Sequence, residues 1–289
     1  MNTNATQAWR GKWMVTGLQE TLKAALCAEK ICAVDRTDSM YIWNPYGGAP
    51  TTVVQAIVGT YTPATYTTTN DSLTVTDEFV VSEQIHDFEK VMYQYDLFSA
   101  RTNEMVASVT TALDKWVLNY LLDEGTGAYT TSSDGFNAPA NIPVILSNLL
   151  AKVAGYATNY VGLGSSLYLV IEAADTVGFY QAGIASGFNF ADSWLKNGWV
   201  DNVSGIDIYI KPNNTFVTDT IGTKSYANSG HRLFGVKGIS TYCSPRGIQY
   251  KEKDGISGLL GTEIVVWGYV GFAAWYNKLA LTVDITVTP

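Results

Sequence analysis

The longest regular pattern of apolar positions in the chain lies between residues 96 and 124. Apolar side chains recur there at steps of three and four residues, which is the period of a helix with one buried face. The stripe consists of Met105, Val109, Leu113, Trp116 and Tyr120, widened by Val106, Val117 and Leu121. Asp96 stands at the N-cap position and Gly125 at the position where a left-handed residue ends a helix. The pattern predicts one uninterrupted helix of about 40 Å.

Before this helix, the period of the pattern changes from that of a helix to that of strands. Residues 41–84 are rich in Thr, Val and Tyr, are bounded by turn-forming residues and contain no Lys or Arg. They predict a strand, a turn and a second strand. Such a hairpin buries little by itself, so we expect it to project and to complete its burial on a partner. A hairpin folded back onto its own sheet fits this segment equally well.

Residues 1–38 have the pattern of an arm. Leu18, Leu22 and Leu26 lie four positions apart and predict one short amphipathic helix. An isolated helix of this length is marginal in water. It must therefore dock on its own subunit or on a neighbour.

A Gly-, Ser-, Thr- and Pro-rich stretch at 125–141 marks a boundary, after which the pattern is α/β. A helix is predicted to start near Asn141. The run LYLVI at 167–171 is apolar throughout, as expected of a central strand buried on both faces. A second helix follows, and then a strand that places Ile206, Ile208 and Ile210 on one face. Residues 231–242 are predicted to extend the same sheet.

The C-terminal part is again rich in strands. Residues 264–276 are the most apolar run in the chain and predict a buried pair of strands. The strands within 246–288 are expected to form a closing hairpin. They would return to the sheet beside the long helix, which would make the first domain discontinuous.

Composition favours a protein that buries surface against other subunits. Charged residues are 15% of the chain, below the usual level of about 25%, and aromatic residues are 12%. A monomeric β-rich protein with a sticky surface is the alternative. The formal net charge is −8 and no basic run is present, which argues against tight binding to a phosphate backbone. It leaves open a protein that merely encloses nucleic acid.

Candidate chemistry is sparse, so we expect neither enzymatic activity nor a cofactor or metal. His86 and His231 are the only histidines, and no nucleophile signature or phosphate-binding loop accompanies them. Paired carboxylates remain possible for Glu83, Glu172 and Asp175. The cysteines lack ligand spacing and are expected to be small buried hydrophobes in a reducing compartment: Cys27, Cys32 and Cys243.

No segment approaches the roughly 20 apolar residues of a membrane span, and the N-terminus has no signal-peptide core. We therefore expect no membrane partner and synthesis in the cytoplasm. Aromatic side chains are the candidate contacts with other subunits. They are Trp43, Tyr46, Tyr61 and Tyr66 in the hairpin and Trp116 in the long helix.

Two stretches carry a family resemblance. The first is SLTVTDEFVVSEQIHDFEKVMYQYDLFSARTNEMVASVTTALDKWVLNYLLDEG, where a hairpin strand leads into the long helix. The second is LYLVIEAADTVGFYQ, followed by GWVDNVSGIDIYIKPN. With the order of the other elements, the chain resembles the major capsid protein of tailed bacteriophages, the Hong Kong 97-type fold. The match is one of pattern and order over essentially the whole chain, because this family has no short diagnostic motif.

The resemblance implies an α+β fold with named parts. These are an N-terminal arm at 1–38, an extended β-hairpin (E-loop) at 39–84, a peripheral domain at 85–141 and 243–289 with its spine helix at 96–124, and an α/β axial domain at 142–242. The E-loop would lie over a neighbouring subunit. It contains no lysine, so the isopeptide cross-link of some relatives is not expected. Only about a hundred residues precede the end of the long helix, so a separate scaffolding protein is expected rather than a cleaved N-terminal segment.

The implied function is self-assembly into pentamers and hexamers of an icosahedral shell that encloses the double-stranded DNA of a tailed bacteriophage. The implied partners are further copies of the chain, a portal protein, the scaffolding protein, packaged DNA bound without sequence specificity and, as an optional addition, a decoration protein. The location would be the virion, assembled in the bacterial host cytoplasm. Two alternatives stay open: an encapsulin-like nanocompartment shell, and a carbohydrate-binding or hydrolytic β-rich protein.

Overall fold

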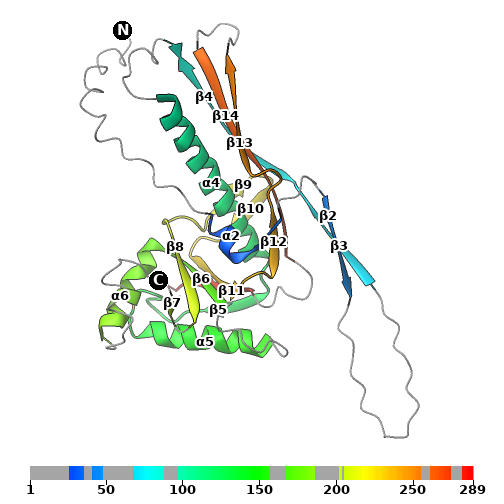
Figure 1. The fold of residues 1–289 in the computed structure, drawn as a ribbon. Coiled ribbons are helices and arrows are strands. Elements are labelled where there is room, and N and C mark those ends of the chain that lie inside the picture. Colours follow the sequence, from blue (N-terminus) through cyan, green and yellow to red (C-terminus); the bar gives the residue numbers. More distant parts are fainter. Residues whose placement is uncertain are drawn as a thin grey trace, which may run out of the picture.

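The computed structural model describes residues 26–35, 41–47, 68–87, 97–156, 167–185, 202–203, 205–254, 261–274 and 282–288. Two sheets lie one beyond the other along the molecule, and a two-stranded ribbon extends away from them (Figure 1). Several predicted features fall outside the described residues. These are most of the N-terminal arm with Leu18 and Leu22, the N-cap Asp96, and residues 48–67 with Tyr61 and Tyr66.

The predicted long helix is confirmed as α4 (Leu97–Glu124). Its stripe is buried, with Val109, Leu113 and Trp116 no more than 1% exposed. The helix ends before Gly125, but this glycine is not in the left-handed conformation, so that expectation is wrong. A Cβ atom on Gly125 would lie 3.0 Å from Thr282 Cγ2 and 3.2 Å from Thr282 O. Glycine fits here because another strand passes close to the helix end.

A five-stranded sheet lies along α4 and is built around one long strand, β14 (Gly261–Ala274). Its antiparallel partners are β4 (Asp77–His86), β13 (Ile248–Asp254) and β12 (Ser240–Cys243), and β1 (Ala33–Asp35) runs parallel to β12. Alternate residues of β14 face α4 and are buried, as Ile264, Val266 and Val270 show. The hairpin of β13 and β14 therefore returns beside the long helix as predicted.

The expected pair of strands at 264–276 is wrong, because β14 continues through both of its internal glycines. Gly268 admits the helix, since a Cβ atom there would lie 3.2 Å from Leu113 Cδ1. Gly271 admits the base of the ribbon, since a Cβ atom there would lie 2.9 Å from Thr74 O. Both glycines serve close packing and neither makes a turn.

A six-stranded sheet forms the other part of the molecule. Its order is β5 (Gly127–Thr130), β15 (Thr282–Thr286), β11 (His231–Val236), β6 (Leu167–Glu172), β8 (Ile206–Lys211) and β7 (Asn202–Val203). The helices α5 (Asn141–Tyr156) and α6 (Thr176–Ala185), the latter preceded by a 3-10 turn at Ala173–Asp175, lie on one side (Figure 1).

The central strand β6 explains why its sequence is apolar at every position. Leu167, Leu169 and Ile171 belong to the core with α5 and α6, whereas Tyr168 and Val170 belong to the core with α4. Every residue of the strand is buried. The prediction of a central strand with two covered faces is confirmed.

Two strands join a different sheet from the one expected. β15 was expected beside the long helix but pairs with β11 and, in parallel, with β5. Residues 231–242 were expected in one sheet, but only β11 lies in the six-stranded sheet, while β12 crosses to β14. Most positions of both strands are buried, and the strands are short, so their sequences fit either sheet. The two sheets therefore interlock through chain crossings.

Two short ribbons complete the fold. β2 (Tyr41–Gly47) and β3 (Thr68–Thr74) pair antiparallel from Tyr41–Thr74 to Gly47–Thr68. They form the ribbon that points away from both sheets (Figure 1). β9 (Thr218–Ile221) and β10 (Lys224–Ala227) form a small hairpin beside α4. Part of the predicted hairpin thus projects as β2 and β3, whereas its last residues, from Asp77 on, belong to β4 of the five-stranded sheet.

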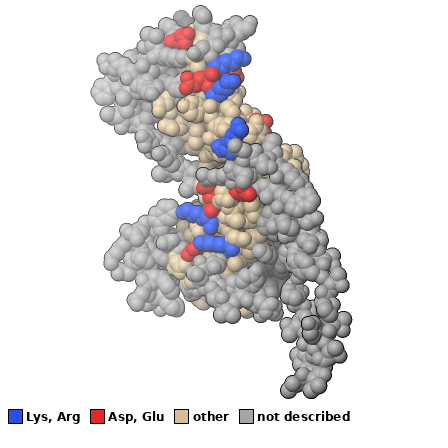
Figure 2. Space-filling model, turned by 45° about the vertical axis from the view of Figure 1, so that its right-hand side comes forward, with Lys and Arg blue, Asp and Glu red and all other residues tan. Residues whose placement is uncertain are grey.

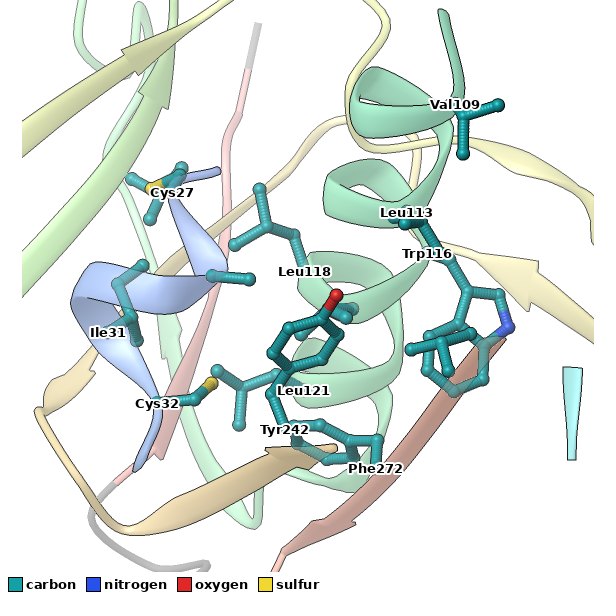
Figure 3. Close-up of a cluster of buried hydrophobic side chains, with 14 of the residues drawn as sticks. Cys27, Ile31, Cys32, Val109, Leu113, Trp116, Leu118, Leu121, Tyr242 and Phe272 are labelled. Atoms are coloured by element: carbon teal, nitrogen blue, oxygen red, sulfur yellow. The ribbon is translucent and has the colours of Figure 1, made fainter. Parts of the chain in front are cut away.

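The short helix α2 (Ala28–Ile31) packs into the core between the two sheets. Figure 3 shows Cys27, Ile31 and Cys32 in one cluster of buried side chains with Leu118 and Leu121 of α4. The cysteines are free thiols and buried, as expected of small hydrophobes. Burial raises the pKa of the Cys32 thiol to about 12, which keeps it protonated and unreactive near neutral pH.

Substitution of Gly178 tests the contact of α6 with the loop before α5. A Cβ atom there would overlap the carbonyl oxygen of Phe136, whose ring stacks on Phe179 at 5.8 Å. We expect Gly178→Ala to lower the free energy of unfolding by about 1–3 kcal/mol, because rigid backbone must shift. Denaturant unfolding measures this, with Gln181→Ala on the exposed side of α6 as the control. Equal stability of the two variants would contradict the close contact.

Candidate assembly surface

The structure separates the predicted contact residues into three groups. Trp43 and Tyr46 lie in β2 of the projecting ribbon. Tyr61 and Tyr66 lie outside the described residues. Trp116 is 1% exposed and packs on Phe79 and Tyr120 within the subunit. Trp116 is therefore a core residue, and its assignment as a contact with other subunits is corrected.

The ribbon of β2 and β3 is a sheet of only two strands. Within the described part of the chain, each of its strands pairs only with the other, so its outer edges carry backbone N–H and C=O groups without a strand partner. A two-stranded ribbon is marginally stable in water by itself. Free strand edges are also templates for pairing with another chain. The ribbon is thus the described element best suited to contact a second molecule.

A second surface is the face of the five-stranded sheet that points away from α4. On β4, alternate residues on this face are exposed: Glu78, Val80, Ser82 and Gln84. Val80 is 57% exposed and lies opposite the half-buried Trp267 of β14. Val265 and Tyr269, also half-buried, continue the strip along β14. An apolar strip within a polar surface is typical of a contact region.

A buried ion pair joins three segments distant in sequence. Asp114 of α4 has a side chain 2% exposed and pairs with Lys211 at the end of β8. It also accepts a hydrogen bond of 2.7 Å from the backbone N–H of Ala28 in α2. Burial raises the pKa of Asp114, and Lys211 partly opposes that rise. This contact holds the arm segment, the long helix and the six-stranded sheet together.

The carboxylates considered as an acid–base pair have structural roles. Glu172 and Asp175 do come together, but both bind the buried guanidinium of Arg232. Glu172 also accepts hydrogen bonds from the backbone N–H groups of Thr215 and Phe216. Glu83 lies elsewhere and pairs with Arg101. Each of the three carboxylates forms an ion pair with an arginine, so these residues stabilise the fold.

The described residues contain no group of His, Cys, Asp and Glu that could hold a metal ion. His231 pairs with Asp284 at 2.7 Å on neighbouring strands, and no nucleophile accompanies it in the hydrogen bonds described. In the described regions, no helix is both long and apolar enough to cross a membrane. Figure 2 shows acidic and basic side chains next to one another in small groups over the face that it draws.

The comparisons with known proteins identify the fold. No protein-family model matches the chain, and no curated protein matches it by sequence. Solved structures do match. The capsid of the cyanophage P-SCSP1u aligns with a TM-score of 0.70 at 14% identity, covering 95% of this chain and 91% of that one. The mature capsid of bacteriophage PhiM1 aligns with a TM-score of 0.66 at 8% identity, covering 94% and 90%.

The capsid of an empty GTA particle aligns with a TM-score of 0.68 at 13% identity, covering 94% of this chain and 93% of that one. All three are capsid structures, and they match over nearly their whole length. The chain therefore has the mixed α+β fold of phage major capsid proteins, as the order of its elements predicted.

Proposed function

We propose that this protein is the major capsid protein of a tailed bacteriophage. In this proposal it assembles into pentamers and hexamers of an icosahedral shell that encloses double-stranded DNA. The observation that carries the proposal is the likeness in fold to phage capsid proteins over 95% of the chain. Sequence identity is low, so the fold and the surface features together support the function.

The surface supports assembly through contacts between unlike patches. The ribbon of one subunit offers two strand edges that pair with no other described strand, and the outer face of the five-stranded sheet offers the apolar strip around Val80 and Trp267. A contact between two different patches repeats around an axis and closes a ring when the rotation allows. We expect the ribbon of one subunit to reach the sheet of its neighbour.

The chain would be divided into functional parts along its sheets. The arm would include α2, the E-loop would be the ribbon of β2 and β3, and α4 would be the spine helix of a peripheral domain with the five-stranded sheet. The six-stranded sheet with α5 and α6 would be the axial domain. That domain would then include β5 and β15, which pair within its sheet.

The charge balance suits a wall that encloses DNA and does not bind it tightly. The net charge is −8, and ion pairs neutralise described cations such as Arg101, Arg232 and Lys224. We propose that the protein acts as a structural subunit of the virion and not as an enzyme. Its partners would be a portal protein, a separate scaffolding protein and, in some shells, a decoration protein. Assembly would take place in the cytoplasm of the bacterial host.

Electron microscopy of the purified protein tests this proposal, with expression both alone and together with the neighbouring genes. Closed polyhedral shells, or rings of five and six subunits, are the expected result. Nuclease-protected DNA inside the shells would support the virion. A protein cargo instead of DNA would support the nanocompartment.

Dispersed monomers in every preparation would contradict shell assembly. A glycan-binding screen would then test the carbohydrate-binding alternative.

A further inference from the structure

The β9–β10 hairpin lies beside α4, and its tip contacts the base of the projecting ribbon. Its root is attached to α4 through Asn119, which is fully buried. The Asn119 side chain accepts a hydrogen bond of 3.2 Å from the backbone N–H of Val217 and donates one of 2.8 Å to Thr215 O. Asn228, after the second strand, donates its side-chain N–H to Asn119 O at 3.1 Å. The root of the hairpin, residues 215–217 and Asn228, is therefore held on α4 by several buried hydrogen bonds.

The tip of the hairpin reaches the base of the projecting ribbon. Asp77 is the first residue of β4, follows the end of the ribbon strand β3 at Thr74 after two intervening residues, and is 5% exposed. Its carboxylate accepts hydrogen bonds from Thr223 N at 2.9 Å, from Thr223 Oγ1 at 3.3 Å and from Thr76 Oγ1 at 2.8 Å. Thr223 of the tip thus binds the position where the ribbon meets the sheet, in addition to the close packing of Thr74 on Gly271 of β14.

The turn has no room for a larger residue. Gly222 has a φ of +64°, which two-residue hairpin turns require and glycine tolerates best. A Cβ atom on Gly222 would overlap a carboxylate oxygen of Asp77 and lie 3.3 Å from Trp116 Nε1. The tip therefore fits between the ribbon base and the core of α4.

Two polar groups buried near the hairpin have unmet hydrogen-bonding capacity. Among the described side chains, Trp116 Nε1 and Tyr226 Oη are the buried polar atoms without a hydrogen-bond partner. Leaving such a group unpaired costs roughly 1–3 kcal/mol, and solvent would satisfy both groups if the hairpin lifted. Within the described residues the hairpin joins no larger sheet, so it depends on these contacts for its order. Lifting the hairpin would therefore recover part of the cost of leaving these two groups unpaired.

Partly exposed ion pairs also hold the hairpin against α4, but only weakly. Lys224 Nζ lies 2.7 Å from Asp123 Oδ2, 3.0 Å from Glu124 Oε1 and 4.0 Å from the centre of the Tyr120 ring. These carboxylates are about 40% exposed, and ion pairs of that exposure contribute little to stability. They favour the closed position and allow it to open.

We propose that the β9–β10 hairpin is a clip: its tip holds the ribbon base in one orientation through Asp77, and its release frees the ribbon to pivot while the root stays on α4. The clip belongs to the single subunit and does not depend on the proposed shell function. It couples the order of residues 68–76 to that of residues 218–227, which are about 150 positions apart in the chain.

Hydrogen–deuterium exchange on the full chain tests the clip with Asp77→Ala. Every variant is compared in the same oligomeric fraction. We expect exchange in both 68–76 and 218–227 to become about tenfold faster or more, because hydrogen bonds to a charged group are lost. The buried strand 167–172 should be unchanged. Glu78→Ala is the matched control, since it removes the adjacent acid on the exposed side of β4.

Faster exchange in 218–227 alone would overturn the coupling, and so would unchanged exchange in both segments. An equal rise in all three segments would also overturn it, because the contact would then serve only global stability. If Asp77→Ala does not fold, Gly222→Ala decides by the same criteria, since it displaces the tip and leaves the carboxylate in place.

Discussion

Replacing residues 48–67 with Asn-Gly is expected to yield a folded subunit that forms no closed shells. Gly47 and Thr68 are paired across the two strands, so a two-residue turn can join them directly. Shortening the connection changes loop entropy by no more than about 2 kcal/mol, and in the favourable direction. All the described strands of the two sheets and their core residues remain in the variant. The variant would therefore lose only the contact that the ribbon makes with a neighbouring subunit.

The measurement combines denaturant unfolding with electron microscopy of the assembled fraction. A second variant keeps the length of 48–67 but carries the same residues in shuffled order, which separates reach from side-chain recognition. Closed shells from the shortened variant would contradict a role of the ribbon in assembly. Unfolding of that variant would instead place 48–67 in the core of the subunit.

Lys211→Met is expected to lower the free energy of unfolding at neutral pH by about 3–5 kcal/mol. The variant leaves Asp114, 2% exposed, without its cation in the core between the sheets. The remaining hydrogen bonds from the backbone of Ala28 and Cys27 do not compensate a buried carboxylate. Because this contact joins α2, α4 and β8, the loss should affect the whole subunit.

The loss should also depend on pH in a defined direction. Burial already raises the pKa of Asp114 in the folded state, and Lys211 opposes that rise. Without Lys211 the folded-state pKa rises further above its unfolded value, so the folded state binds the proton more tightly. The variant is then most stable below the unfolded pKa and loses stability as pH rises through the folded pKa. Its deficit should be small near pH 4 and full at pH 7.

Two further variants make this result specific. Lys237→Met breaks a similar pair with Asp207, whose members are 25% and 31% exposed, and should cost no more than about 1 kcal/mol. Asp114→Asn combined with Lys211→Met removes both charges and should recover most of the loss at neutral pH. A deficit in Lys211→Met that does not change with pH would show that Asp114 does not govern it.

Periodicity alone determined the elements with one-sided or fully buried faces. The stripe of Leu113 and Trp116 specified α4, and the uniform run at 167–171 specified a strand covered on both faces. In each case burial requires one spacing of apolar side chains, and the sequence displays that spacing directly. The order of these elements was enough to indicate the capsid fold.

Tertiary structure alone decided which sheet each strand joins and what each buried polar residue does. The short, mostly buried sequence of β15 fits either sheet, and pairing with β11 chose between them. Gly268 and Gly271 resemble turn residues in sequence but admit α4 and the ribbon base. Asp114 and Asn119 interrupt the apolar surface of α4, a visible signal, yet their partners are about 90–100 residues away. Local pattern fixes a residue's environment, whereas its partners depend on contacts formed only when distant segments pack.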